Sequence, residues 1–514
     1  MSTAAGAARG RPGLFANSRW NLVAFACGLA ANFVVLPFVV RWIGLPAFGL
    51  VGLVIALCAP LTIVGTVLGQ AMVRELADRT GRSDDASSAL ALRAGLRLAL
   101  LTSVAGAMGL VLAGPPIAQA LFGNASGPDV QGAFCIAAVG WLSQQLTLVF
   151  QGAAAGRQDY RTIAQVAAFG AVATVVVTLG WTAWRPDIYG YLAGMSASLA
   201  LTLGAWVIAL RRELADALHA VADRAETVNA QRALLRFGRW QGLAQLAGTL
   251  SNQIDRYALG ALAPVAFVGQ YNVANRLQEA AYIGVVKGSE VLFPHFGSLA
   301  ARSVAERAEF FQRASWVAGT FGAMLLAPLV PLSHAVLVLW VGSAAADGSD
   351  LLLRTLVLGG LVGCGSNVFT YYAMGIGRNE LVAWLSVGYS VLTVALTVVL
   401  IAGWGPAVAG GGLLIASVVR VFAALLLTRR ACFPELRWGE LVVSTLVPVT
   451  VGSVIAVGAQ ALQLGRADTW LSAALLYAAF AAAVLAATIA VTLVARSGRR
   501  IVSVAAASWQ RAAA

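Results

Sequence analysis

The sequence has little charge and almost no lysine. Only 11% of its 514 residues are charged, and Lys287 is the single lysine among 35 basic residues. Soluble proteins carry roughly 25% charged residues. Hydrophobic residues make up 59% of the chain, and its mean hydropathy is +0.80. Too little polar material remains to cover a water-facing surface, so a soluble globular fold is excluded and lipid is the expected solvent.

Residues that build disulfides, metal centres and nucleotide sites are also scarce. The five cysteines form no CxxC pair, and the three histidines lack the spacing of metal ligands. The sequence contains no Walker motif, no GxSxG and no HExxH. Its loops are too short for a catalytic domain outside the membrane. We therefore expect no catalytic residues, no metal, no cofactor and no enzymatic activity.

What the chain does contain is long apolar runs. A transmembrane helix needs about 20 mostly apolar residues, and an open sheet edge cannot lie in lipid. The fold class we predict is an all-α polytopic membrane protein with about 14 helices. The expected spans are 20–40, 48–72, 91–113, 130–150, 162–184, 188–210, 238–262, 267–295, 314–338, 351–374, 381–402, 407–428, 441–463 and 469–495.

The arginines indicate the topology. A net charge of +13 often means nucleic-acid binding, but these arginines lie in short loops between apolar runs, so we expect no nucleic-acid partner. With the N-terminus in the cytoplasm, 27 of the 34 arginines fall inside, as the positive-inside rule requires. This alternation predicts cytoplasmic N- and C-termini and a first helix that is retained. The outer arginines are Arg41, Arg185, Arg354 and Arg466.

Two segments suggest an internal repeat. RWNLVAFACGLAAN at 19–32 matches RWQGLAQLAGTLSN at 239–252 with a shift of 220 residues. GRQDY at 156–160 and GRNEL at 377–381 match with a shift of 221. The repeat predicts two parallel six-helix units, related by an axis along the membrane normal, with a site between them. The expected limits are 1–210 for the first unit, 211–237 for a cytoplasmic linker, 238–430 for the second unit, and 431–514 for an extra helix pair and tail.

Charges inside membrane spans are costly and therefore mark candidate functional residues. The seventh span carries polar or small residues on one helical face, and so does the eighth. The first set is Gln241, Gln245, Gly248, Asn252 and Asp255; the second is Asn272, Arg276, Glu279, Lys287 and Glu290. Both stripes are expected to face away from lipid. Arg256 projects about 100° from Asp255, and Arg420 lies deep in the twelfth span without a recognisable partner.

Asp255 and Arg276 are expected at similar depths. At about 1.5 Å per residue, they lie about 10 Å and about 14 Å below the outer ends of their spans, so they could form an ion pair. One interpretation is a structural salt bridge. The other is a protonatable or ion-binding carboxylate whose partner changes during transport, a role that Glu279 could also fill. Lys287 and Glu290 lie near the cytoplasmic interface, where snorkelling alone explains them.

The repeat also pairs residues of the two halves. Asn32 corresponds to Asn252, which suggests two polar points facing a central cleft, although interhelical hydrogen bonding explains such residues equally well. Arg19 and Arg239 would stand at matched cytoplasmic mouths, and the positive-inside rule is a sufficient explanation for them.

Several motifs resemble one family. LPFVVRWIGLPAFG and GQAMVRELA in the first half, and DRYALG, VGQYNVANRL and FPHF in the second, are similar to those of Wzx-type flippases for O-antigen and exopolysaccharide. That family belongs to the multidrug/oligosaccharidyl-lipid/polysaccharide exporter superfamily. The resemblance implies a V-shaped pair of six-helix units that works by alternating access in the bacterial inner membrane.

The resemblance also implies a substrate and partners. The substrate would be an undecaprenyl-pyrophosphate-linked oligosaccharide, moved to the periplasmic leaflet and driven by a proton or sodium gradient or the membrane potential. Polysaccharide polymerase and glycosyltransferases would act beside it in polysaccharide and lipopolysaccharide biosynthesis. Arg276 and Arg256 would suit a pyrophosphate, and Arg19 and Arg239 could recruit it.

Three alternatives remain open. Ion-coupled multidrug antiporters of the superfamily typically have 12 spans, which fits 14 less well. Lipid II flippases have 14 but carry arginines well inside the first span, whereas residues 21–40 here hold no charge. The third is a non-transporting membrane protein, such as a scaffold or an integral glycosyltransferase. An integral transferase would need an acidic catalytic residue beside a sizeable loop, and none occurs.

Overall fold

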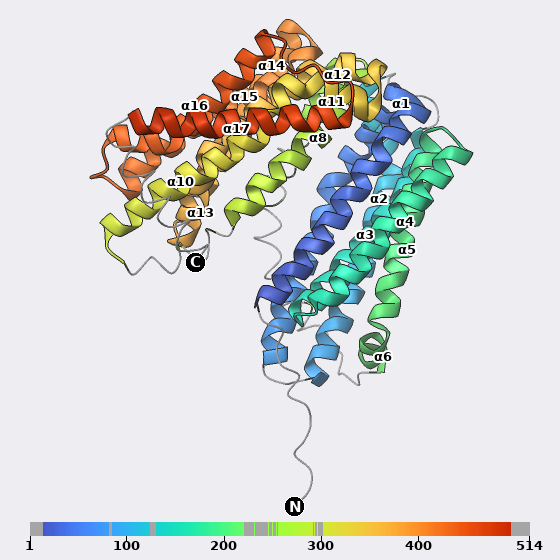
Figure 1. Ribbon diagram of the computed structural model, residues 1–514. Coiled ribbons are helices and arrows are strands. Elements are labelled where there is room, and N and C mark those ends of the chain that lie inside the picture. Colours follow the sequence, from blue (N-terminus) through green and yellow to red (C-terminus); the bar gives the residue numbers. More distant parts are fainter. Residues whose placement is uncertain are drawn as a thin grey trace, which may run out of the picture. The chain divides into compact units, whose positions relative to one another are not determined.

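The computed structural model describes residues 14–81, 85–123, 130–219, 255–290 and 302–494, together with positions 231, 245, 249, 253, 292 and 296. Every regular element in these ranges is a helix (Figure 1), so the predicted all-α fold is confirmed. Eleven helical segments among the described residues are long and apolar enough to cross a membrane.

The helices fall into two series along the chain. The first consists of α1 (Leu14–Gly81), α2 (Asp85–Phe122), α3 (Val130–Gly156), α4 (Tyr160–Trp184), α5 (Ile188–Ala209) and α6 (Arg211–His219). The second consists of α8 (Val265–Glu290), α10 (Val304–Leu326), α11 (Leu329–Val341), α12 (Ser343–Gly363), α13 (Asn367–Gly375), α14 (Asn379–Trp404), α15 (Gly410–Leu427), α16 (Trp438–Ala461) and α17 (Trp470–Val494).

The 11 apolar segments agree with the predicted spans. The first covers two spans, because α1 breaks at Gly44, whose φ of +78° lies in the left-handed region that glycine tolerates. Ten further segments each correspond to one predicted span. The predicted eighth span is α8, which is more polar than the others. The predicted seventh span lies mostly outside the described residues.

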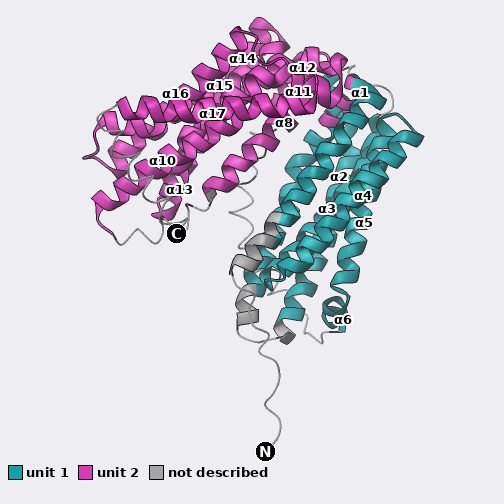
Figure 2. Ribbon diagram, in the orientation of Figure 1, with its two compact units in different colours: residues 1–44, 54–250 teal, residues 45–53, 251–514 magenta. Residues whose placement is uncertain are grey.

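Contacts group the chain into two compact units (Figure 2). The first unit contains residues 1–44 and 54–250, and the second contains 45–53 and 251–514. Residues 45–53 thus belong to α1 along the chain but to the second unit by their contacts. The domain limits drawn from the sequence, the V shape and the parallel repeat remain predictions.

Pairs of glycines let helix backbones approach closely within each unit. In the second unit, a Cβ at Gly269 of α8 would overlap the carbonyl oxygen of Leu45, and one at Gly49 would overlap that of Val265. In the first unit, a Cβ at Gly152 of α3 would overlap the backbone of Gly69. Such close crossings supply van der Waals contact, which drives helix association where no hydrophobic effect acts.

The two matching GRxxx turns make comparable contacts in their own units. Arg157 forms an ion pair with Glu213 of α6 at 3.3 Å, just after the last helix of the first series of spans. Arg378 donates to the carbonyl oxygen of Ala431 at 2.7 Å, just after α15. Each arginine therefore ties the turn after the fourth span of its half to the segment after the sixth.

The C-terminal helices α16 and α17 pack against α10 in the second unit. Trp316 of α10 donates to Thr492 of α17 at 3.0 Å, and Tyr477 of α17 donates to the carbonyl oxygen of Leu325 at 2.6 Å. Lipid tails offer no hydrogen-bond partners, so these bonds satisfy polar groups that would otherwise remain unpaired. They also attach the extra helix pair to the second unit.

Replacing Gly269 with alanine should destabilise the second unit, because the new Cβ would meet the backbone of residues 45–53. We expect a loss of about 1–3 kcal/mol, typical of overpacking, measured by thermal unfolding of the purified protein in detergent. Gly388→Ala in α14 is the matched control, since a Cβ there meets nothing within 4 Å. Equal melting of the two variants would show that this crossing is not close.

Candidate functional site

Asp255 is a buried carboxylate held by two hydroxyl groups. It is 7% exposed and accepts hydrogen bonds from Tyr271 Oη at 2.6 Å and from Thr397 Oγ1 at 3.1 Å. Tyr271 belongs to α8 and Thr397 to α14, so three separate helical segments of the second unit meet at this group. A carboxylate has about four acceptor positions, so two bonds leave room for a proton or a small cation.

The sequence places these hydroxyls through simple helical spacing. Thr393, Thr397 and Ile401 are buried at four-residue intervals, which puts them on the inner face of α14. Tyr271 is 4% exposed and lies on the inner face of α8. The hydroxyl of Thr393 donates to a carbonyl oxygen of its own helix, whereas Thr397 reaches Asp255.

Arg256, the next residue, interacts electrostatically with Asp255 and is hydrogen-bonded to neutral amides. Its Nε donates to Asn272 Oδ1 at 2.7 Å, and its guanidinium also donates to Gln253. Asn272 packs against bare backbone, because a Cβ at Gly52 would overlap its amide nitrogen. These neutral amides orient the guanidinium but supply no countercharge, and Arg256 is partly buried.

The expected ion pair between Asp255 and Arg276 is not formed. Arg276 instead lies 3.6 Å from Glu279 on its own helix, and both side chains are about half exposed. Glu279 also accepts from Asn275 at 2.8 Å. Side chains three and four residues apart on a helix are neighbours, so α8 itself supplies a partner for Arg276. Asp255 finds its donors on other helices.

The polar stripe predicted on the eighth span is not uniform. Asn272 is 5% exposed, whereas Arg276, Glu279 and Lys287 are exposed. The difference arises because residues 45–53 cover α8 at the end that holds Asn272 and leave the rest of the stripe uncovered.

The remaining predicted site residues are only partly described. Asn32 is exposed, and its amide donates to the carbonyl oxygen of Gly28 in its own helix at 2.9 Å. Its predicted counterpart Asn252 lies outside the described residues. So do Arg239 and the side chains of Arg19 and Glu290.

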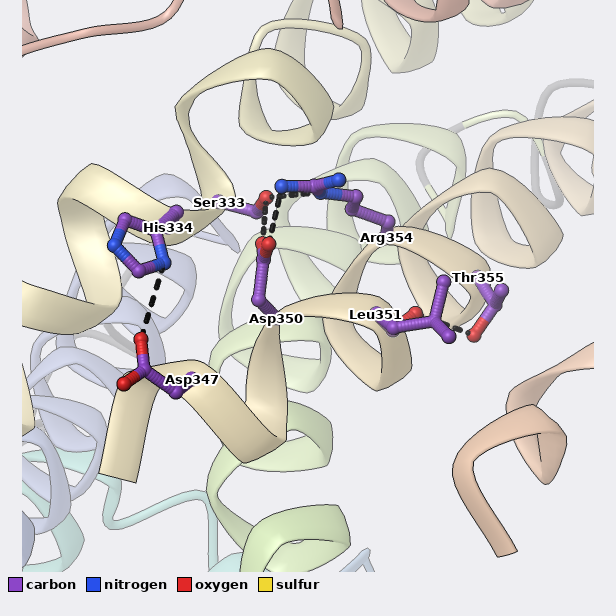
Figure 3. A network of polar contacts seen from close by, with 7 residues as sticks. All are labelled: Ser333, His334, Asp347, Asp350, Leu351, Arg354 and Thr355. Carbon is purple, nitrogen blue, oxygen red and sulfur yellow. Dashed lines mark hydrogen bonds and ion pairs between the residues drawn. The ribbon is translucent and has the colours of Figure 1, made fainter. Parts of the chain in front are cut away.

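Sequence reasoning missed a network at α11 and α12 (Figure 3). Arg354 donates to Ser333 Oγ at 2.9 Å, and Asp350 accepts from both Ser333 and Arg354. With its amide oriented to satisfy its neighbours, Gln460 of α16 accepts from Arg354 at 2.9 Å and donates to Val330. From the sequence, Arg354 counts only as one of the outer arginines, at the start of the predicted span 351–374. The four-residue spacing of Asp350 and Arg354 is the signal that could have identified the pair.

A weaker pair lies at the edge of the same network. His334 Nδ1 lies 4.0 Å from Asp347, and these side chains are 50% and 75% exposed. Exposed pairs contribute little to stability, so the network depends on Asp350 and Arg354.

Comparisons with known proteins agree with this architecture. Residues 14–300 match a family model described as polysaccharide biosynthesis protein. A multidrug resistance MATE family transporter of the MOP superfamily, solved facing inward, superimposes with a TM-score of 0.69 at 16% identity, covering 80% of this chain and 94% of that one. The lipid II flippase MurJ, in an inward closed conformation, superimposes with a TM-score of 0.66 at 10% identity. The match covers 91% of this chain and 98% of that one.

A third similar structure is a MOP superfamily transporter from Pyrococcus furiosus, whose binding pocket is described as reversed in polarity. It gives a TM-score of 0.56 at 16% identity, covering 80% of this chain and 94% of that one. No curated protein matches the chain. The chain therefore has the fold of the MOP superfamily.

Removing Asp350 should destabilise the protein because it leaves the partly buried Arg354 without its countercharge. We expect Asp350→Ala to cost about 3 kcal/mol, seen as a lower melting temperature in detergent. Asp347→Ala is the control within the same network, with an expected effect of at most about 0.5 kcal/mol. A double variant with Arg354→Ala should lose less than the sum of the single variants. Strict additivity would contradict the interaction.

Proposed function

The chain belongs to the polysaccharide biosynthesis protein family, and from this premise we propose that it is a lipid-linked oligosaccharide flippase of the Wzx type. It moves undecaprenyl-pyrophosphate-linked units from the cytoplasmic to the periplasmic leaflet by alternating access. The bilayer is the bacterial inner membrane, and the product feeds O-antigen or exopolysaccharide synthesis. Glycosyltransferases supply the substrate and a polymerase consumes it.

The observation that supports this function most directly is the buried carboxylate of Asp255. A charged group inside a membrane protein is costly and marks a functional site unless a countercharge stabilises it. The hydrogen bonds to Asp255 come from two neutral hydroxyls, and Arg256 acts on it electrostatically without a hydrogen-bonded ion pair among the described residues. We infer that it binds the coupling cation, a proton or sodium, and that occupancy changes how α8 and α14 meet.

Cations near this carboxylate suit an anionic substrate. Arg256 retains its charge among amides, and Arg276 is half exposed on α8. Guanidinium groups form strong charge-assisted bonds with phosphate oxygens. We propose that Arg256 and Arg276 contact the pyrophosphate, and that Arg19, Arg239, Lys287 and Glu290 line the cytoplasmic mouth. Asn32 and Asn252 would contribute neutral hydrogen bonds to the passage.

The second candidate is a lipid II flippase. It is favoured by the wider coverage of the lipid II flippase structure, which extends over more of this chain than the multidrug transporter does. The uncharged stretch at residues 21–40 favours the oligosaccharide substrate. An ion-coupled multidrug antiporter shares the fold but leaves the extra helices α16 and α17 without a role.

The deciding experiment follows lipid-linked oligosaccharide in the bacterium that carries this chain. After deletion, intact spheroplasts are treated with a membrane-impermeant glycan oxidant. The proposal predicts that the lipid-linked unit is made but stays protected from the oxidant, and that the restored protein exposes it. If the lipid-linked unit is not made at all in the deletion strain, the chain is better explained as an enzyme that assembles it, such as an integral glycosyltransferase. An accessible unit in the deletion strain would contradict a flippase.

Purified protein in liposomes separates the transport alternatives. Lipid-linked oligosaccharide, lipid II and ethidium are offered in parallel, and movement of each is followed. The proposal predicts that the oligosaccharide moves at least tenfold faster than the other two. Equal or faster movement of lipid II, or transport of ethidium alone, would select the corresponding alternative.

Asp255→Asn should reduce flipping at least tenfold and remove its dependence on the ion gradient, because asparagine keeps the size but cannot carry the charge. Membrane insertion and melting temperature should stay near those of the wild type. Asp347→Asn is the control, since it removes an exposed carboxylate of the same unit. Normal flipping by the Asp255 variant would reduce this residue to a structural role.

Arg276→Ala should also impair flipping. We expect it to raise the substrate concentration needed for a half-maximal rate and to leave the dependence on the ion gradient intact. The concentration dependence of the rate in liposomes distinguishes the two effects. An unchanged concentration dependence would exclude contact between Arg276 and the substrate.

A further inference from the structure

A further arginine, Arg420, lies inside the second unit and is not part of the site proposed above. Arg420 is in α15, seven residues before that helix ends at Leu427, or about 10 Å along its axis. Its guanidinium carbon lies 4.8 Å from the ring centre of Tyr389 on α14. Its Nε is buried and has no hydrogen-bond acceptor among the described residues.

Helical spacing shows that Arg420 faces the protein interior. Ala416 and Ala424 lie one turn on either side of it, and both are buried. Val419 and Phe422 are exposed and form the outer face of the helix. Arg420 therefore does not reach lipid on the outer face of α15.

The side-chain amide of Asn367 is a second donor without an acceptor among the described residues, and it is linked to Arg420 through Tyr282. Tyr282 of α8 interacts electrostatically with Arg420, and its hydroxyl donates to Asn367 Oδ1 at 3.2 Å. Asn367 is 8% exposed, and its Nδ2 is buried with no acceptor among the described residues. The cluster therefore presents two unused N–H donors and one positive charge.

The helix opposite these groups presents glycines. A Cβ at Gly363 of α12 would lie 3.8 Å from Ser417 Oγ and 3.9 Å from Tyr282 Oη. A Cβ at Gly360 would lie 2.9 Å from the amide nitrogen of Gln278. Bare backbone at these two positions lets polar side chains of α8 and α15 face one another across α12.

The two acidic residues of the proposed transport site that the structure describes are already engaged. Asp255 is held by Tyr271 and Thr397, and Glu279 pairs with Arg276. Arg420 forms no ion pair within the described part of the chain. The ring of Tyr389 offsets only part of the cost of removing a cation from water, so a bound countercharge would stabilise Arg420 further.

We propose that Arg420 and the Nδ2 of Asn367 bind a monovalent anion of the halide class inside the second unit. One guanidinium neutralises one negative charge, whereas a divalent anion would stay partly uncompensated in a medium of low dielectric constant. N–H groups without acceptors are the ligands that a halide takes. The site is separate from the proposed cation site at Asp255 and does not depend on the flippase function.

The test uses the purified full chain in detergent, in gluconate buffer free of halide. Chloride is titrated while the linewidth of its chloride-35 NMR signal and the melting temperature of the protein are followed. We expect saturable broadening and a rise in melting temperature, competition by bromide, and no effect of sulfate. A lack of saturable chloride binding, or displacement by sulfate, would overturn the proposal.

Two variants locate the site. Arg420→Gln should weaken chloride binding at least tenfold. Asn367→Asp should abolish it while the protein stays folded in halide-free buffer, because the new carboxylate supplies the countercharge itself. Arg429→Gln is the matched control: Arg429 also stacks on an aromatic ring, 4.7 Å from Trp438, but lies at the end of the span. Wild-type chloride binding by both test variants, or equal loss in the control, would contradict the assignment.

Discussion

The interior of a bilayer contains no water, so every charge within it must be satisfied by the protein itself or by a bound ion. This constraint explains the polar contacts of the second unit. Asp350 and Arg354 satisfy each other, and Ser333 completes their bonds. Among the described residues, Asp255 is hydrogen-bonded by two hydroxyls and interacts electrostatically with Arg256. The first arrangement fixes helices, whereas the second can change when a cation binds, and that difference separates the structural acid from the proposed functional one.

The charges are unevenly distributed between the two halves. In the first unit, a buried contact at the helix interface is neutral: the amide oxygen of Gln145 accepts from the backbone of Gly65 at 2.6 Å. In the second unit, ionisable groups occupy the interior. The neutral amide at Gln145 and the carboxylate at Asp255 therefore show two ways of placing a polar group at a helix interface.

The sequence predicted the fold well because hydrophobic length and arginine placement are local properties. Ten apolar segments match single spans, and the break at Gly44 accounts for two more. The site was harder to predict, because its partners are distant in sequence: Thr397 is 142 residues from Asp255. Equal depth suggested Arg276 as the partner, but depth does not fix direction around a helix. Glu279, three residues away, pairs with Arg276 instead.

The central claim is that cation binding at a buried carboxylate drives movement of the lipid-linked substrate. The most direct measurement is the flipping rate of wild-type protein in liposomes under an imposed proton or sodium gradient, before and after an ionophore collapses it. One of the two gradients should accelerate flipping, and its collapse should return the rate to the basal value. A rate that is the same with and without either gradient would contradict this claim.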